Sequence, residues 1–387
     1  MSHKAGRGLR KGLVVAQTFF HEPGNCISFR RSGIIFHETP DNYIPAQMIC
    51  TRSRLLLLLL TFLSVLSCAP KEYVEKVPEM YWPLPPEKPR IKFVNLILGS
   101  ADAKMESGKI KSLLFGAEGD VRFVKPFGVA VAGRKLFVTD IGGVYSFDFA
   151  KGEFKIFGRD ELRVPAGIAA TDERVYVGDV ARKRIYVYDT SGRVVMNFGA
   201  GKVDTPGGIA VDKIRGRLIV SDARRNVVDI FNTDGGLISS IGSRGREHGE
   251  FNIPYGVAVD KDGRIYVVDS GNFRLQIFDK NGKFLKQFGG VGTSPGNFAR
   301  PKGVAVDSDG NIYILDAAFG NFQIFDFDGN TLLAVGNTGV DPGEFMLPSS
   351  IYIDAQDRIY ITDQINKRIQ IFQYLKDEPN KEQSVAR

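Results

Sequence analysis

Cysteine and histidine are nearly absent from the repeated part of this 387-residue chain, and this excludes several kinds of site. Cys26, Cys50 and Cys68 all lie before the repeats, so neither a disulfide nor a thiolate metal site is available there. Only His248 of the four histidines lies within the repeats. One histidine cannot build a three-histidine zinc site, and no nucleophile-elbow motif accompanies His248 for a Ser-His-Asp arrangement.

A strongly basic folded body is also missing, although the formal net charge is +7. Residues 1–67 contain eight Lys or Arg and three Asp or Glu, which leaves 43 basic and 41 acidic residues in the rest of the chain. The basic excess therefore belongs to the beginning of the chain. We expect no nucleic-acid partner, because nucleic-acid binding needs a basic face on the folded body.

No apolar run is long enough to span a bilayer comfortably; the longest extends from Leu55 to Leu66. It follows two arginines and ends in small residues, which is the pattern of a secretory signal peptide. Val65-Leu66-Ser67-Cys68 resembles the lipobox of bacterial lipoproteins, although Leu66 stands where that family usually has a small residue. The resemblance implies cleavage before Cys68 and attachment of lipid to its sulfur and new amino group. An ordinary signal peptide with an incidental cysteine is the alternative.

The position of this run predicts where translation starts and where the protein is located. A signal peptide begins near its charges, as a chain starting at Met48 does and one starting at Met1 does not. We expect residues 1–47 to be an over-extended, disordered start and residues 48–67 to be the lipoprotein signal peptide. The alternative is a genuine extension that keeps the protein inside the cell. Ala69 is not the aspartate that, by family resemblance, retains lipoproteins in the inner membrane, so we expect the outer membrane of a bacterial cell envelope, facing the periplasm.

Six prolines between Ala69 and Arg90 favour extended polyproline-II geometry. Residues 68–90 are therefore predicted to form a semi-rigid, lipid-anchored tether. Its segment Tyr81-Trp82-Pro83-Leu84-Pro85-Pro86 resembles a proline-rich docking ligand. The alternative is a spacer whose Trp82 packs on the rim of the folded body. Residues 376–387 are predicted to be a polar tail.

The chain does contain a repeated unit, which is clearest from Pro254 to Gly289. Four short runs of β-branched and aromatic residues alternate there with three turns rich in Gly, Asn and Asp, so the unit is predicted to be a four-stranded meander. Nearly every residue of the runs is apolar, so both faces of the sheet must be covered. An aspartate closes the second strand of each copy, at Asp140, Asp179, Asp222, Asp269, Asp316 and Asp363, with spacings of 39, 43, 47, 47 and 47 residues. This period predicts an all-β, six-bladed propeller over residues 91–375.

The two ends of the repeated region each hold an incomplete unit. Ile91 to Leu98 is a strand with no partners before it, and the unit that begins at Pro348 lacks its fourth strand. We therefore expect residues 91–98 to complete the last blade, which removes the open sheet edges that promote aggregation.

The units have the form Pro-x-Gly-Val-Ala-Val-Asp, then Ile-Tyr-Val-x-Asp, then Arg-x-Gln-Ile-Phe-Asp, and they resemble NHL repeats. The resemblance covers roughly Lys125 to Phe372. It implies a six-bladed propeller, but no single function, since NHL-type propellers serve as protein-binding, RNA-binding and occasionally lyase modules.

Several recurring residues are expected to serve the fold. The arginines Arg184, Arg274 and Arg368 each follow the aspartate of their unit by five residues, which predicts a structural ion pair or hydrogen bond within each blade. The turns Asp260–Gly263 and Asp279–Gly282 have the composition of hairpins, in which Asp accepts backbone N–H groups and Gly adopts a positive φ.

Function is expected in loop residues that the repeat does not demand. The loops before the first strand and between the second and third strands lie on one face of a propeller, and here that face is basic with some aromatic content. We interpret it as a site for an anionic or peptide partner. The candidate binding residues are Arg182, Arg224, Arg225, Arg244, Arg246, His248 and Phe319.

The sequence favours non-enzymatic recognition of another envelope protein, or of an envelope or extracellular polymer, with no cofactor beyond the lipid on Cys68. The alternative is a gluconolactonase-like or lyase-type enzyme with a metal such as calcium near the central channel. The acids of this chain cluster in hairpin turns, where they have a local role in binding the backbone. Thermal stabilisation by calcium would favour the enzyme.

Overall fold

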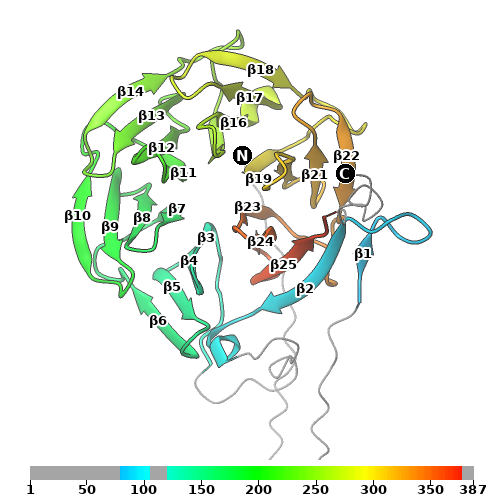
Figure 1. Ribbon diagram of the computed structural model, residues 1–387. Helices are drawn as coiled ribbons and strands as arrows, with labels where there is room; N and C mark the ends of the chain where they lie inside the picture. Colours follow the sequence, from blue (N-terminus) through cyan, green and yellow to red (C-terminus); the bar gives the residue numbers. More distant parts are fainter. Residues whose placement is uncertain (1–78, 105–119, 377–387) are drawn as a thin grey trace, which may run out of the picture. The chain divides into compact units, whose positions relative to one another are not determined.

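The computed structural model describes residues 79–104 and 120–376, which form a ring of six antiparallel sheets (Figure 1). The described residues contain only two short 3-10 helices, η1 (Ser100–Lys104) and η2 (Ser270–Asn272). None of these residues belongs to a helix long and apolar enough to cross a membrane. The predicted six-bladed, all-β propeller is therefore confirmed. The predicted start, the signal peptide, Cys68 and the polar tail beyond Lys376 lie outside the described residues.

Each blade is a meander of four strands, ordered from the axis of the ring outward. Blades 1 to 3 contain β3 (Val129–Ala132), β4 (Lys135–Asp140), β5 (Gly143–Asp148) and β6 (Glu153–Phe157); β7 (Pro165–Ala170), β8 (Arg174–Asp179), β9 (Arg184–Asp189) and β10 (Val194–Phe198); and β11 (Pro206–Asp212), β12 (Arg217–Asp222), β13 (Val227–Asn232) and β14 (Leu237–Ile241). Blades 4 to 6 contain β15 (Pro254–Val259), β16 (Ile265–Asp269), β17 (Arg274–Phe278) and β18 (Phe284–Phe288); β19 (Pro301–Val306), β20 (Ile312–Asp316), β21 (Asn321–Phe325) and β22 (Thr331–Val335); and β23 (Pro348–Ile353), β24 (Arg358–Asp363), β25 (Arg368–Tyr374) and β2 (Ile91–Ile97).

Blade 6 is completed by the strand that comes first in the ring. β2 pairs antiparallel with β25, with Ile91 opposite Tyr374 and Ile97 opposite Ile369. This confirms the predicted closure of the ring, because the last blade obtains its fourth strand from residues far away in the sequence. Outside β2, a short strand β1 (Tyr81–Trp82) adds a fifth member to the sheet.

Trp82 lies against blade 6. Its ring meets the edge of Phe372 with a centroid distance of 5.8 Å and an interplanar angle of 63°. The packing of Trp82 on the folded body, which was the alternative to a docking ligand, is thus present in the structure. An edge-to-face aromatic pair of this kind adds about 0.5–1.5 kcal/mol beyond the area it buries.

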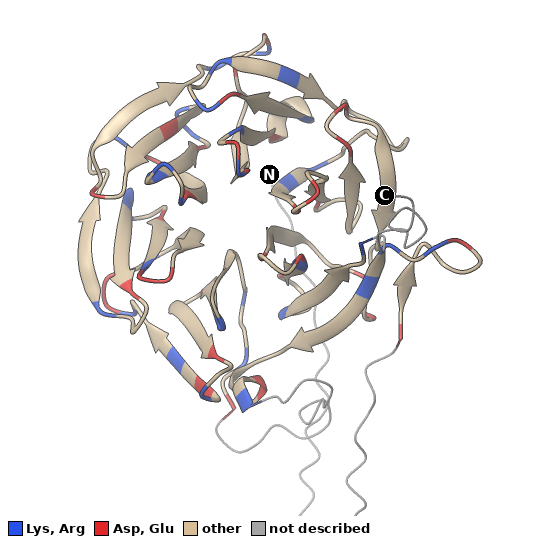
Figure 2. Cartoon of the chain, in the orientation of Figure 1, with Lys and Arg blue, Asp and Glu red and all other residues tan. Residues whose placement is uncertain are grey.

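The core consists of six apolar clusters, each between neighbouring blades. The cluster between blades 3 and 4, for example, joins Ile219 of β12 and Phe278 of β17 around Phe251. The second and third strands are buried on both faces, as their continuous apolar runs predicted. Charged residues lie mainly in turns and loops, and few lie on the innermost strands (Figure 2).

Close approach of the inner strands explains the glycine of Pro-x-Gly. A Cβ at Gly256 would lie 2.4 Å from the carbonyl oxygen of Lys302 in the next blade. The hairpin turns also form as predicted. Asp279 accepts the backbone N–H groups of Asn281 and Lys283 at 2.8 and 2.9 Å, and Gly282 has a φ of 85°.

Candidate functional site

The recurring aspartates tie each blade to the loop that leads into it. Asp140 accepts the backbone N–H groups of Val124 and Lys125 at 2.8 and 2.7 Å, and it is buried. Equivalent bonds to the leading loop are made by Asp179, Asp222, Asp269, Asp316 and Asp363. Their place in every copy is therefore explained by the fold.

Two of the three predicted Asp–Arg contacts form. The Nε atoms of Arg274 and Arg368 lie 2.9 Å from the carboxylates of Asp269 and Asp363, and all four side chains are buried. The guanidinium of Arg274 also donates to the carbonyl of Glu247 at 2.9 Å. These arginines hold the leading loop against the blade.

The prediction was wrong for Arg184. Its exposed side chain donates to Asn197 at 2.9 Å and forms no ion pair with Asp179. The loop before β7 covers only residues 158–164, whereas the loop before β15 covers residues 242–253. The shorter loop offers no equivalent carbonyls, so the arginine is left at the surface.

Three buried glutamines were missed as partners of the loops. The side-chain oxygens of Gln276, Gln323 and Gln370 each accept a glycine N–H of the leading loop at 2.9 Å. Their amides donate to loop carbonyls at 2.6–2.9 Å. Their spacing in the sequence could have identified them as recurring residues, because each glutamine follows the aspartate of its blade by seven residues.

The candidate Arg225 has a structural partner. It forms an ion pair with Asp229 of β13, whose carboxylate is fully buried. Asp229 stands where blade 4 has Gln276, so Arg225 neutralises a charge that the other blades do not have. Its neighbour Arg224 is well exposed and lies 3.8 Å from the carboxylate of Asp204.

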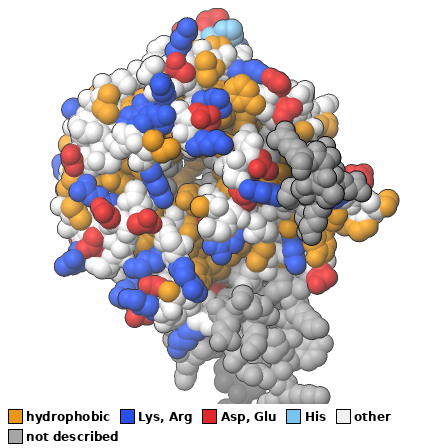
Figure 3. Space-filling model, viewed as in Figure 1, with side chains coloured by type: hydrophobic (Ala, Val, Ile, Leu, Met, Phe, Trp, Pro, Cys, Tyr) orange, Lys and Arg blue, Asp and Glu red, His pale blue; other side chains and the backbone are white. Residues whose placement is uncertain are grey.

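The remaining candidates lie on separate loops. Arg182, Arg244 and Arg246 are exposed, and the backbone N–H of Phe319 binds Asp316 at 3.1 Å. The ring of His248 stacks on Phe284 of the outermost strand β18, with centroids 4.5 Å apart and an interplanar angle of 5°. Among the described residues no hydrogen bond, ion pair or ring contact joins any two of the seven candidates. On the face shown in Figure 3, basic and acidic side chains are interspersed, so that face has no patch of a single sign.

The six first strands bring a different set of residues together. The second residue of each Pro-x-Gly segment stands at or just before the start of a first strand, on the side of the loops between second and third strands, and four of the six line the central channel. It is a different residue in each of the six copies. The set, which we call the channel mouth, is Phe127, Ala166, Gly207, Tyr255, Lys302 and Ser349. Five of these residues are followed by a glycine, and in blade 6 Ser350 stands where the other blades have the glycine.

The channel mouth is closed by an aromatic pair. Phe127 of blade 1 and Tyr255 of blade 4 come from opposite sides of the ring, and their centroids are 6.1 Å apart with an interplanar angle of 44°. The amine of Lys302 lies 3.7 Å from the centroid of the Tyr255 ring. Burial, and secondarily the charge of Arg300, lowers the pKa of the Lys302 amine to about 8.

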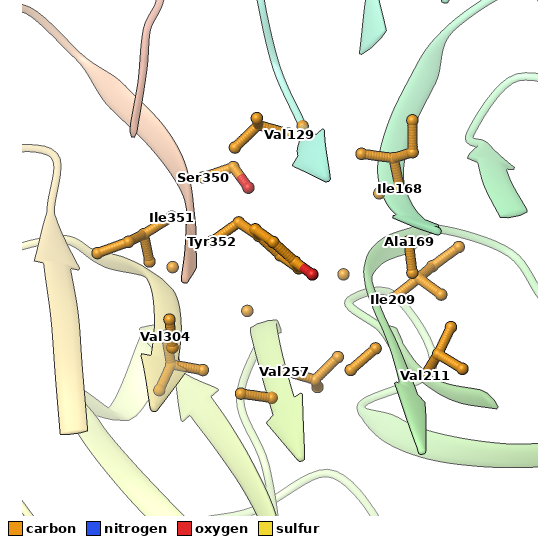
Figure 4. A pocket seen from close by; sticks show the side chains of 18 of the residues that line it. Val129, Ile168, Ala169, Ile209, Val211, Val257, Val304, Ser350, Ile351 and Tyr352 are labelled. Atoms are coloured by element: carbon orange, nitrogen blue, oxygen red, sulfur yellow. The ribbon is translucent and has the colours of Figure 1, made fainter. Parts of the chain in front are cut away.

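Behind the mouth is a cavity of about 210 Å³ lined by the first strands. Figure 4 shows Tyr352 extending into its middle, with Val129, Ile168, Val257 and other apolar side chains around it. The hydroxyl of Tyr352 donates to the carbonyl of Val131 at 3.1 Å, and burial raises the pKa of Tyr352 to about 12. The cavity is smaller than the ~300–1,000 Å³ of typical ligand sites.

The lining of the channel is largely apolar. No Asp, Glu or His is among the residues that line it. Over residues 79–104 and 120–376, no three His, Cys, Asp or Glu side chains are grouped closely enough to hold a metal ion.

Comparisons with known proteins agree with the fold. The family model DUF5128, described as "6-bladed beta-propeller", matches residues 259–322 and 308–385, which is less than half of the chain. No curated protein matches the chain. The chain is thus a six-bladed β-propeller.

Two solved propellers from Bacteroides thetaiotaomicron VPI-5482 are similar in structure. One is a structural genomics protein of unknown function, with a TM-score of 0.51 and 20% identity over 65% of this chain and 70% of that one. The other is described as an auxiliary nutrient binding protein, with a TM-score of 0.53 and 14% identity over 66% of this chain and 70% of that one. Identities this low establish the fold alone.

Proposed function

We propose that this chain is a non-catalytic recognition module of the NHL type, which binds another envelope protein, or an envelope or extracellular polymer, through the loop face around the channel mouth. The observation that carries the proposal is the variation at the channel mouth. Residues that the fold demands are the same in each copy, as the aspartates are, whereas the mouth residues differ. An aromatic pair beside an amine suits recognition of a partner with an acidic group.

The size and lining of the channel support binding at the surface. A cavity of about 210 Å³ without carboxylates or histidine has neither the room nor the acid–base groups for most hydrolytic reactions. The face around the mouth also exposes apolar side chains, including Val164, Ile253 and Ile365, each about half exposed. Such side chains are expected in a contact surface for a larger partner.

Site-specific photocrosslinking in intact cells tests the proposed face. Phe127 is replaced by the aromatic photocrosslinker p-benzoylphenylalanine, and Lys261, in a hairpin turn on the opposite face, is replaced in a matched variant. We expect a discrete adduct from position 127 and none from position 261. Adducts of equal yield from both positions, or only from position 261, would contradict the proposal.

We further propose that the propeller is held at the outer membrane, facing the periplasm, by lipid on Cys68. The support is the sequence alone, namely the signal-peptide pattern and the lipobox resemblance. Mass spectrometry of the native N-terminus tests it, since the mature chain is expected to begin at a lipidated Cys68. Peptides from residues 5–45 in the mature protein would refute it.

A further inference from the structure

A repeated contact links neighbouring blades on the hairpin face. At four junctions, the cation at the start of the second strand reaches the turn between the third and fourth strands of the next blade. The contacts are Lys135 to the Thr190 carbonyl at 3.2 Å, Arg174 to the Thr233 carbonyl at 3.2 Å, Arg217 to the Lys280 carbonyl at 2.7 Å, and Arg264 over the Phe327 ring at 5.0 Å. Blade 5 has Asn311 at this position, and there Ser308 joins blade 6 through Asp357 instead.

The junction that closes the ring lacks this contact. Arg358 holds the equivalent position in blade 6, but its Nε donates to Asp354 of its own blade at 2.8 Å. The carbonyl of Phe149, in the turn of blade 1 that Arg358 would reach, accepts only a long bond of 3.4 Å from Arg134. The cation-to-turn contact seen at four junctions is therefore missing between blades 6 and 1, which are joined near this face by the hydrogen bond from Tyr352 to the Val131 carbonyl.

A groove of about 920 Å³, which we call the closure groove, lies at the junction between blades 6 and 1, where the cation-to-turn contact is missing. This volume is within the ~300–1,000 Å³ of typical small-molecule sites and is about four times that of the central channel. The groove is lined by Val94, Asn95, Ile97, Val131, Gly133, Arg134, Lys135, Leu136, Phe149, Gln356, Arg358, Tyr360 and Ile371.

The lining combines apolar walls with positive charge. Val94 of β2 is 37% exposed. Phe149 is partly buried and packs against the apolar cluster between blades 6 and 1. The lining contains no Asp or Glu, and its charged residues are Arg134, Lys135 and Arg358. Lys135 and Arg358 form ion pairs with Asp148 and Asp354, at 3.7 and 2.8 Å. Arg134 has no carboxylate partner among the described residues. A ligand that covers the apolar wall and neutralises the charge of Arg134 is expected to have a hydrocarbon body and an anionic head.

We propose that the closure groove binds a small amphiphile with a hydrocarbon chain and a carboxylate head, with the chain against Val94 and Phe149 and the head at Arg134 and Arg358. The hydrocarbon chain gains about 0.8 kcal/mol for each CH₂ group that it buries. The guanidinium groups supply the paired N–H donors that match a carboxylate. The site is independent of the channel mouth, since it lies at the other face of the ring.

Titration calorimetry of the whole protein with octanoate, octanol and octylammonium tests the proposal. Octanoate is expected to bind at least tenfold more tightly than either of the other two. Arg134→Glu should weaken octanoate binding at least tenfold. Lys261→Glu, which makes the same charge change in the corresponding turn of blade 4, should change it less than twofold. Equal affinity for octanoate and octanol, or equal effects of the two substitutions, would overturn the proposal.

A photoreactive fatty acid with a diazirine in its chain locates the site in the unmodified protein, so the test does not depend on a variant that folds poorly. We expect labelled peptides that contain Val94 or Phe149. Labelling confined to peptides that contain neither residue would overturn the proposal, even if octanoate binds.

Discussion

Phe127 and Tyr255 contact each other across the axis of the ring, at a centroid distance of 6.1 Å, although they belong to blades 1 and 4. The amine of Lys302 lies over the Tyr255 ring of this pair, 3.7 Å from its centroid. A cation above an aromatic ring gains up to ~2 kcal/mol when it is desolvated, which partly offsets the cost of burying it. Burial, and secondarily the charge of Arg300, lowers the pKa of the Lys302 amine.

Lys302→Met is predicted to stabilise the protein at pH 7. Burial lowers the pKa of Lys302 from its ordinary value of 10.5 to about 8 in the folded state, so the unfolded chain binds this proton more tightly. Stability therefore rises with pH between these two values, and the penalty for charging Lys302 is fully present below pH 8. We expect a gain of about 1–3 kcal/mol at pH 7 that disappears near pH 10.5. Urea unfolding at both pH values measures it, with Lys261→Met as the exposed control.

The same substitution separates stability from recognition. If the channel mouth binds an acidic group, Lys302→Met loses crosslinking from position 127 although the protein is more stable. A variant that is less stable than the native protein at pH 7 would contradict the burial of the charged amine.

Arg225→Ala is predicted to destabilise the fold, whereas Arg224→Ala is not. Loss of Arg225 leaves the fully buried carboxylate of Asp229 without its cation, which costs about 3 kcal/mol. Arg224 is exposed, and its ion pair with Asp204 is long, at 3.8 Å, so the loss of Arg224 costs about 0.5 kcal/mol or less. Chemical denaturation of both variants measures the difference. Arg225→Ala combined with Asp229→Asn should recover part of the loss, and equal stability of the two single variants would show that the buried pair does not form.

Phe93→Ala is predicted to weaken the closure of the ring. Phe93 of β2 is 1% exposed and packs edge-on against Phe372 at 5.5 Å, so its truncation costs about 3–5 kcal/mol. Val94→Ala, next to it on the outward side of the same strand, should cost less than about 1 kcal/mol. Thermal unfolding compares the two variants, and deletion of residues 91–98 should prevent cooperative folding. A normal melting temperature for that deletion would contradict closure by β2.

Gln276→Leu is predicted to loosen the loop before β15 without disturbing the blade. The substitution leaves the N–H of Gly249 without its partner and removes one of the two donors to the carbonyl of Glu250, which still accepts from Arg274 at 3.0 Å. The loss of one partly buried hydrogen-bond partner costs about 1–3 kcal/mol. Hydrogen exchange should accelerate in residues 242–253 and stay unchanged in β16. Lys286→Leu, in the outermost strand of the same blade, is the control. Unchanged exchange in the loop would show that water or the backbone replaces the glutamine.

Much of the fold was predictable because each blade is built from contacts near in sequence. The spacing of Asp140, Asp179 and the later aspartates gave the number of blades, and the incomplete units gave the closure by β2. The pairing of Asp269 with Arg274 was also predictable, because both residues belong to one hairpin. Arg184 also follows its aspartate by five residues, but the loop before β7 is shorter than the loop before β15, and the Asp–Arg spacing does not reveal the length of that loop.

The sequence by itself determined the all-β repeat, the six blades and the residues that the repeat demands, since these follow from local periodicity and turn chemistry. Only the tertiary structure brought Phe127 to Tyr255 and Arg225 to the buried Asp229, and only it left the groove between Arg358 and Phe149. The physical reason is ring closure: contacts across the axis, and between the last blade and the first, depend on the angle at which all six blades meet.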